Sequence, residues 1–275
     1  MLWRLLIGAG VLAGCTPVPA PESGRAAVYT VGGPYEAGGA WHYPAERFGG
    51  QQTGLAVRHP GTRLAADRER WDDTRSVASH PTLQLPSVVR VTNLDTGTSI
   101  VVRVIDRGPP EPGRLIGLSA QAADWLGVGQ GAVPVRVMVD GLRSQALADT
   151  LAPPTPGLMA APRAAVLRED LSGRPLVQTA SAPAAPDLAL PAGPQPGPPE
   201  AGRIYLRAST FGQRRYAEMQ AQTLQSLRPA ITADGRGRAE TFMVRAGPYA
   251  RVADADAALD QARRAGVTDA QIVVE

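Results

Sequence analysis

Apolar and polar residues divide the chain into an apolar leader, two folded regions and a long segment without a regular pattern. The leader covers residues 1–14, and the folded regions cover residues 28–141 and 203–275. Residues 142–202 between them are rich in proline and alanine and contain no aromatic residue. Because such a composition cannot bury a hydrophobic core, the sequence predicts a disordered linker there.

The first folded region is organised around two β-branched runs within residues 85–106. They flank Asp95-Thr96-Gly97, a turn in which the glycine supplies a positive φ angle. Ser119 predicts the N-cap of a short helix over 120–126, and residues 133–139 alternate as a closing strand. Many short strands with one small helix predict a compact, mainly β barrel.

The second folded region alternates strand-like and helix-like runs. Strands are expected at residues 204–208, 230–232, 241–245 and 270–274. Between them, apolar residues repeat at helical spacing from Tyr216 to Leu227 and from Val252 to Ala262. The resulting order is βαββαβ, which predicts an α+β domain of the ferredoxin-like type.

Composition and charge narrow the functional classes. The 28 basic residues are all arginine, and the net charge of +3 is spread along the chain, which disfavours a nucleic-acid partner. The single cysteine, Cys15, excludes an internal disulfide framework. No cluster of histidine, cysteine and carboxylate residues has metal-ligand spacing, so neither a metal nor another cofactor is expected.

The leader has the form of a bacterial signal peptide, because one arginine precedes a short apolar run that ends in small residues. Leu12-Ala13-Gly14-Cys15 resembles a lipobox, which implies cleavage before Cys15, lipid attachment to it, and a tether over residues 15–27. The alternative is an ordinary signal peptide with an unrelated cysteine. Because Thr16 is not an aspartate, the resemblance favours the inner leaflet of the outer membrane.

Four motifs of the first folded region resemble those of the RlpA-type lytic transglycosylases, whose catalytic domain is a double-psi β-barrel. The motifs are Ala66-Asp67-Arg68-Glu69, Ser79-His80-Pro81-Thr82-Leu83, Asp106-Arg107-Gly108-Pro109 and Arg114-Leu115-Ile116-Gly117-Leu118-Ser119. The resemblance extends over residues 28–141. Residues 203–275 resemble a SPOR domain, a module that binds glycan strands without stem peptides. A SPOR domain after a proline-rich linker is the usual companion of an RlpA-type barrel.

Several positions depart from the pattern of that family. Arg68 stands where the family has glycine, Ile105 where it has asparagine, and Gly117 where it has aspartate. An aromatic signature near the N-terminus is reduced to Ala40-Trp41-His42-Tyr43. These departures favour an alternative in which the barrel binds glycan without cleaving it, whereas the retained carboxylates and histidine of the motifs oppose that alternative.

The resemblance implies catalytic roles for Asp106, Glu69 and His80. In a lytic transglycosylase, a carboxylic acid protonates the oxygen that leaves the muramic acid. The resulting carboxylate then takes a proton from the C6 hydroxyl, which attacks C1 and gives a 1,6-anhydro end. Asp106 follows an apolar strand, which favours the raised pKa that such an acid needs. The alternatives are a turn-capping aspartate, an exposed loop glutamate and a histidine that bonds to the backbone.

Substrate-binding residues are expected in both folded regions. Arg107 is a candidate for binding substrate, with pairing to Glu69 or to a backbone carbonyl as the alternative. Trp41 and Trp71 are candidates for stacking on sugar rings, with core packing as their alternative. In the second region, aromatic and basic residues are candidates for lining a sheet face that holds a glycan: Tyr205, Arg207, Phe211, Arg245 and Tyr249.

The sequence therefore predicts a lipid-anchored periplasmic lytic transglycosylase that cleaves denuded peptidoglycan strands at the division septum. Its expected partners are those glycan strands, the membrane through lipid on Cys15, and other septal proteins. Two alternatives remain: a glycan-binding septal lipoprotein without turnover, and a periplasmic scaffold that makes no contact with sugar.

Overall fold

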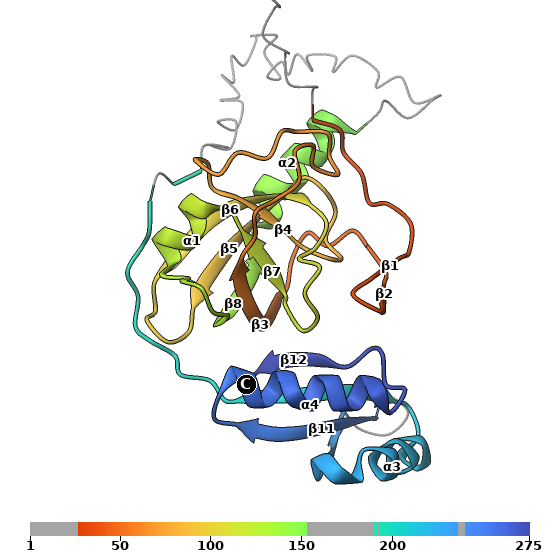
Figure 1. The fold of residues 1–275 in the computed structure, drawn as a ribbon. Helices are drawn as coiled ribbons and strands as arrows, with labels where there is room; N and C mark the ends of the chain where they lie inside the picture. Colours follow the sequence, from red (N-terminus) through yellow and green to blue (C-terminus); the bar gives the residue numbers. More distant parts are fainter. Residues whose placement is uncertain (1–26, 153–189, 192, 236–239) are drawn as a thin grey trace, which may run out of the picture.

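The computed structural model describes residues 27–152, 190–191, 193–235 and 240–275. The predicted signal peptide, the lipid site at Cys15 and nearly all of the predicted tether lie outside the described residues. The described chain forms two domains that lie one above the other in Figure 1. Among the described residues, no helix has both the length and the apolar character needed to cross a membrane.

The first domain is a closed barrel of six strands (Figure 1), which confirms the predicted fold class. The strands are β3 (Gln51–Arg58), β4 (Val77–Ser79), β5 (Ser87–Asn93), β6 (Ser99–Asp106), β7 (Ile116–Leu118) and β8 (Val133–Val139). They follow the order β3-β7-β4-β6-β5-β8 around the barrel. β5 and β6 form the predicted antiparallel hairpin, whereas β4 and β6 are parallel. The carboxyl ends of β4 and β6 consequently lie side by side.

Alternating β-branched residues fill the barrel, because every second side chain of a strand points inward. The buried residues of the hairpin include Val89, Val91, Ile100, Val102 and Val104. Helix α1 (Ala120–Leu126) packs its buried alanines against this core. The Ser119 hydroxyl accepts a hydrogen bond from the backbone N–H of Ala122 at 3.3 Å, and Gly127 ends the helix with a φ of 76°. The predicted helix and its N-cap at Ser119 are confirmed.

A small hairpin lies outside the barrel, against the loop that follows β6. It consists of β1 (Tyr35–Ala37) and β2 (Ala40–His42). At its turn, a Cβ atom on Gly38 would lie 2.8 Å from the carbonyl oxygen of Pro110. The Tyr35 hydroxyl donates a hydrogen bond to the Pro81 carbonyl at 3.0 Å. The irregular N-terminal segment therefore packs beside the motif that contains Asp106.

The predicted linker is shorter than residues 142–202. Its first part belongs to helix α2 (Gly141–Leu151), which packs on β5 through a hydrogen bond from the Val88 N–H to the Ser144 hydroxyl at 3.0 Å. Residues 142–151 contain no proline, and the prolines begin only at position 153, so nothing interrupts this helix.

The last part of the predicted linker binds to the barrel. The backbone N–H of Gln195 donates to the Ser99 carbonyl at 2.7 Å, and the Gln195 carbonyl accepts from the Ser99 N–H at 2.8 Å. Arg136 of β8 pairs with Glu200 through two hydrogen bonds of 3.0 and 2.6 Å. Residues 195–200, which we call the strap, thus lie along the barrel before the second domain begins.

The second domain has the predicted βαββαβ order. Its elements are β9 (Ile204–Phe211), α3 (Arg214–Thr223), the 3₁₀ turn η1 (Gln225–Leu227), β10 (Ala230–Asp234), β11 (Thr241–Tyr249), α4 (Val252–Arg264) and β12 (Gln271–Val274). The antiparallel sheet has the order β10-β11-β9-β12. Buried Leu206 and Val244 of the sheet meet Ala217 of α3 and Leu259 of α4 in one hydrophobic cluster.

The two domains share that hydrophobic cluster. Leu55 of β3 is fully buried and belongs to the same cluster as Leu259 and Ile272 of the second domain. Beside it, the guanidinium of Arg114 forms two hydrogen bonds of 2.7 and 2.8 Å with the carboxylate of Asp256 on α4. Apolar burial and a bidentate ion pair together dock the second domain on the barrel.

Candidate active site

The parallel strand ends bring the predicted catalytic residues together. The backbone N–H of His80, directly after β4, donates to the Asp106 carbonyl at 3.0 Å. From a third segment, the N–H of Asp67 donates to the Ile105 carbonyl at 3.2 Å. The motifs that contain Asp106, His80 and Glu69 therefore meet at one end of the barrel, although they are far apart in the sequence.

The Asp106 carboxylate accepts three hydrogen bonds. Oδ1 accepts from the backbone N–H groups of Ala66 at 3.0 Å and Arg107 at 2.8 Å, and Oδ2 accepts from the Thr62 hydroxyl at 2.5 Å. Asp106 is only 5 % exposed, so its carboxylate is almost completely covered by the residues around it. The motifs gave no sign of Thr62, because a single loop threonine has no pattern.

Glu69 is held by an arginine of the barrel wall. Its Oε1 accepts hydrogen bonds from Nε of Arg103 at 3.0 Å and from Nη2 at 2.5 Å. The side chains of Glu69 and Arg103 are only 16 % and 19 % exposed, so Glu69 is not the exposed loop residue of the alternative. Arg68 before it has a φ of 73°, the left-handed conformation that explains the glycine of the family motif.

Asp67, which precedes Arg68 in the same motif and is not among the predicted site residues, is a fully buried carboxyl group. Its Oδ1 accepts a hydrogen bond from the Glu69 N–H at 2.9 Å, and its buried Oδ2 has no hydrogen-bond partner among the described residues. Burial raises the pKa of Asp67 from 3.8 to about 7; the nearby Glu69 carboxylate adds to the rise and Arg103 opposes it. Asp67 thus fixes the backbone that carries Glu69.

His80 is a neutral, fully buried imidazole. Its Nδ1 lies 3.2 Å from the backbone N of Thr82 and 3.3 Å from that of Leu83, and accepts from both N–H groups. This assigns the ring proton to Nε2, which is buried and has no partner among the described residues. Burial, with the charge of Arg107, lowers the pKa of His80 to about 3. The ring can therefore donate a hydrogen bond but does not act as a charged acid.

Arg107 holds two backbone segments together, and its predicted contact with substrate stays a prediction. Its guanidinium donates to the carbonyl oxygens of Leu83 and Val31, and burial lowers its pKa. The alternative of pairing with backbone carbonyls therefore describes Arg107. It ties the N-terminal segment and the loop after His80 to the Asp106 motif.

Two departures from the family pattern have a steric explanation. Ile105 is fully buried and packs with Ala65, Val77 and Trp71. At Gly117, a Cβ atom would lie 2.5 Å from Oγ of Ser79 and 2.7 Å from Cβ of His59. An aspartate at position 117 does not fit beside His59. Glycine at position 117 therefore provides the space that the His59 side chain needs.

The two tryptophan candidates have different surroundings. Trp71 packs in the small cluster with Ile105, meets the ring of His59 edge-on at 5.5 Å, and donates to Asp73 at 3.0 Å. The core-packing alternative therefore describes Trp71. Trp41 on β2 is 58 % exposed, which leaves its ring free to stack on a sugar.

The predicted glycan-binding face of the second domain contains three of its five candidates. Tyr205 and Arg207 alternate with buried residues of β9 and so lie on the face opposite the helices. Arg245 pairs with Arg207 across the strands, and its guanidinium lies 4.8 Å from the centroid of the Tyr205 ring. The other two candidates, Phe211 and Tyr249, pack against the cluster beneath the helices, which corrects their prediction.

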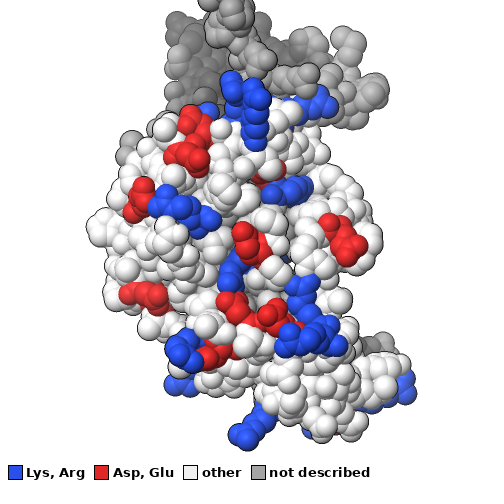
Figure 2. Space-filling view, viewed as in Figure 1, with Lys and Arg blue, Asp and Glu red and all other residues white. Residues whose placement is uncertain are grey.

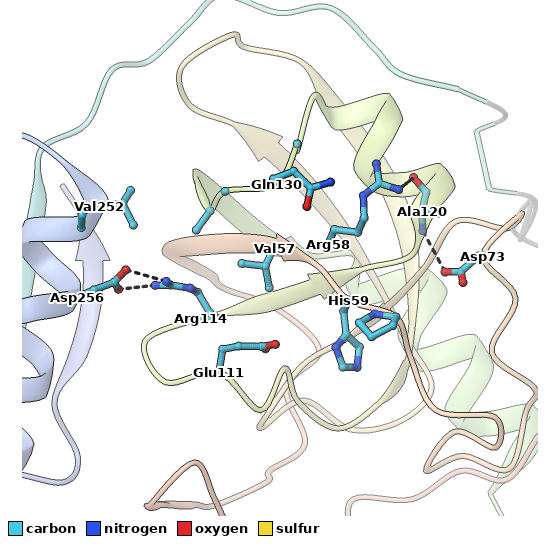
Figure 3. A pocket seen from close by; sticks show the side chains of 15 residues that line it. Val57, Arg58, His59, Asp73, Glu111, Arg114, Ala120, Gln130, Val252 and Asp256 are labelled. Atoms are coloured by element: carbon cyan, nitrogen blue, oxygen red, sulfur yellow. Dashed lines mark hydrogen bonds and ion pairs between the residues drawn. The ribbon is translucent and has the colours of Figure 1, made fainter.

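A cavity of about 730 Å³ lies between the two domains. Figure 2 shows acidic and basic side chains gathered along this boundary, and Figure 3 shows the lining at close range. His59 and Glu111 come from the barrel, and Asp256 comes from α4. Asp106, Glu69 and His80 do not line this cavity, but His59 connects it to their site through Ser79 and Gly117.

Comparison with known families assigns both domains. Residues 57–137 match the family described as "Lytic transglycolase", and residues 200–273 match the SPOR domain. The chain therefore carries a lytic transglycolase domain of the double-psi barrel type and a SPOR domain, as the sequence motifs predict.

Curated relatives agree with this assignment. The chain is 50 % identical over 78 residues to the endolytic peptidoglycan transglycosylase RlpA of Escherichia coli K12, which covers 27 % of this chain and 22 % of the relative. It is 37 % identical over 154 residues to the enzyme of the same name from Pseudomonas aeruginosa UCBPP-PA14, covering 54 % and 43 %. The chain thus spans less than half the length of these relatives.

Proposed function

We propose that this protein is a peptidoglycan lytic transglycosylase, like the relatives that its barrel resembles. The observation that carries the proposal is the meeting of three motifs at one strand end, where Ala66 and His80 both bond to Asp106. Asp106 is the general acid and base of the proposed reaction. Glu69, fixed by Arg103, is the second carboxylate of the site.

The proposed reaction needs no water. Protonated Asp106 donates its proton to the glycosidic oxygen, and the bond from that oxygen to C1 of the muramic acid breaks. The carboxylate of Glu69 stabilises the positive charge that develops at C1. Asp106 then takes the proton of the C6 hydroxyl while O6 bonds to C1, which closes the 1,6-anhydro ring and restores the acid.

The Nε2–H of His80 is a hydrogen-bond donor of this site that has no acceptor among the described residues. It is buried and belongs to a residue whose backbone binds Asp106. We assign it a hydrogen bond to the substrate or to a carboxylate once substrate has entered. Thr62 leaves Oδ2 of Asp106 in the same step.

Digestion of purified glycan strands tests the proposal. The full chain should release products with 1,6-anhydro ends, detected by mass spectrometry, and Asp106→Asn should lower the rate by a factor of about 100 or more. Asp95→Asn, in an exposed turn, is the matched control and should leave the rate unchanged. Products with reducing ends would instead identify a hydrolase, and no product from the wild type would reject the enzyme.

The second candidate function is glycan binding without cleavage. The observation that favours it is the 5 % exposure of Asp106 together with the departure at Gly117, where His59 occupies the space of the family's aspartate. This candidate requires that the protein binds purified sacculi and releases no anhydro product.

The finer parts of the function are also our proposal: action on strands without stem peptides, at the division septum, from the periplasmic side of the outer membrane. The SPOR domain and the lipobox-like sequence at Cys15 support it. Labelled palmitate should be incorporated into the wild type and not into Cys15→Ala. A fluorescent fusion should gather at septa through residues 203–275, and an even distribution around the cell would contradict septal action.

A further inference from the structure

The cavity between the domains has the dimensions of a ligand site. Its volume of about 730 Å³ lies within the range of about 300–1,000 Å³ that is typical of small-molecule sites, which often lie at domain interfaces. Most of its lining comes from four segments: residues 57–60 at and after the end of β3, the loop at 111–114, the loop at 129–132, and the start of α4 at 252–256; Asp73 and Ala120 complete it.

Polar groups without partners project into this space. In Figure 3, Glu111 extends toward His59, and Gln130 extends toward Arg58. Among the described residues, neither the Glu111 carboxylate nor the Gln130 amide has a hydrogen-bond or ion-pair partner. His59 lines the same space but is only 7 % exposed, and its Nδ1 is itself buried, so a molecule in the cavity does not reach that nitrogen. Within the described part of the chain, the unpaired polar groups that the cavity offers a ligand are therefore the Glu111 carboxylate and the Gln130 amide.

The lining suits a sugar ring. A pyranose has a rim of hydroxyl groups, which both donate and accept hydrogen bonds, and a less polar face of C–H groups. The carboxylate of Glu111 accepts from hydroxyls, and the amide of Gln130 does both. Small apolar side chains lie beside them, at Val57, Ala132 and Val252. From these observations we infer that the interdomain cavity binds a saccharide segment of the glycan strand whose cleavage is proposed above.

The position of the cavity fits a strand that also reaches Asp106. Glu111 follows Asp106 by five residues in the same loop. His59 and Ser79 both lie against Gly117, and Ser79 pairs with Asp106 across the parallel strands. Sugar units on one side of the scissile bond therefore occupy the cavity, and the docked second domain forms its far wall.

Docking of the SPOR domain completes this site. The ion pair of Arg114 with Asp256 joins the two walls, and the strap that precedes the second domain is itself bound to the barrel. Without docking, Val252 and Asp256 leave the cavity, and a saccharide there loses one side of its contacts. Saccharide binding in the cavity consequently favours the docked arrangement.

The test uses the isotope-labelled full chain with the Asp106→Asn substitution, so that the ligand is not consumed. A tetrasaccharide of alternating GlcNAc and MurNAc without peptides should shift the amide signals of Gly129, Gly131 and the side chain of Gln130. Removing both polar contacts with Glu111→Ala and Gln130→Ala should weaken that binding about tenfold. Gln225→Ala, an exposed glutamine away from the cavity, is the matched control and should leave the affinity unchanged.

The inference is overturned if the signals of residues 129–131 stay in place while those of Arg207 and Arg245 move to saturation. It is equally overturned if the double variant binds as tightly as the control. Cleavage by the wild type is measured separately. Anhydro products without cavity shifts would reject this inference alone, whereas cavity shifts without products would reject the proposed function and leave the binding site standing.

Discussion

Asp67→Asn should stabilise the barrel at neutral and alkaline pH and have little effect in acid. Asp67 is fully buried, its Oδ2 has no partner among the described residues, and its pKa rises from 3.8 to about 7. Asparagine keeps the side-chain oxygen that accepts from the Glu69 N–H but carries no charge. The substitution therefore removes the cost of ionising a buried acid while preserving the contact that shapes the loop.

The sign and size of this change in the free energy of unfolding follow from the linkage between proton binding and folding. Below pH 3.8 the carboxyl is protonated in both folded and unfolded chains, so its ionisation costs no stability. As the pH rises toward 7, the unfolded chain releases the proton while the folded chain retains it, and the folded state loses stability until both are ionised. Three pKa units at about 1.4 kcal/mol each give an upper bound of about 4 kcal/mol at pH 8, and less than about 1 kcal/mol at pH 4.

Urea unfolding at pH 4.5 and pH 8 measures this difference. Residues 200–275 contain no tryptophan, so tryptophan fluorescence reports the barrel. There Trp71 packs against the cluster that contains Ala65, which precedes Asp67 by two residues. Asp67→Asn should gain more free energy of unfolding over wild type at pH 8 than at pH 4.5. Asp95→Asn, in an exposed turn, should show no such change. An equal gain for Asp67→Asn at both pH values would refute the assigned burial cost.

Three further predictions concern the same end of the barrel. Gly117→Ala should lower the free energy of unfolding by about 1–3 kcal/mol, because its Cβ would overlap Ser79, whereas Gly129→Ala, with open space around it, should change it by less than about 0.5 kcal/mol. Arg68→Gly should raise the melting temperature, since relieving a φ of 73° contributes about 0.5–1 kcal/mol; a lower melting temperature would contradict this. Arg103→Leu should cost about 1–3 kcal/mol in urea unfolding and slow glycan cleavage, because it leaves Glu69 unpaired, and an unchanged stability would count against the ion pair.

The sequence predicts the large features of both domains because local patterns determine them. β-branched runs on both sides of Asp95-Thr96-Gly97 predict β5 and β6, and apolar residues at helical spacing predict α3 and α4. Strands β4 and β7 have only three residues each, so they carry too short a pattern to be seen. Their place in the barrel depends on pairing with distant strands, which no local pattern records.

The site is predictable only where a motif contains it. Asp106, Glu69 and His80 stand in recognisable motifs. The roles of Thr62, outside these motifs, and of Asp67, inside one of them, depend on burial and on contacts that form on folding. In the second domain, the strict alternation of inward and outward side chains along β9 fails. Val244 of β11 lies opposite Ser209 but its neighbour Arg245 lies opposite Arg207, so the register skips one residue of β9. Beyond this shift, Phe211 packs on the side of the helices instead of the open face.

Because the strap is bound to the barrel, the length of the proline-rich segment does not determine the distance between the two domains. The chain leaves the barrel after α2 at residue 151 and is bound to it again at residue 195, so both ends of the intervening segment are attached to the same domain. That segment therefore does not set how far the SPOR domain reaches; residues 201–203 do. Insertions or deletions between 153 and 189 should therefore leave the spacing of the domains unchanged. Changes of length in this part of the chain are thus decoupled from the spacing of the two domains.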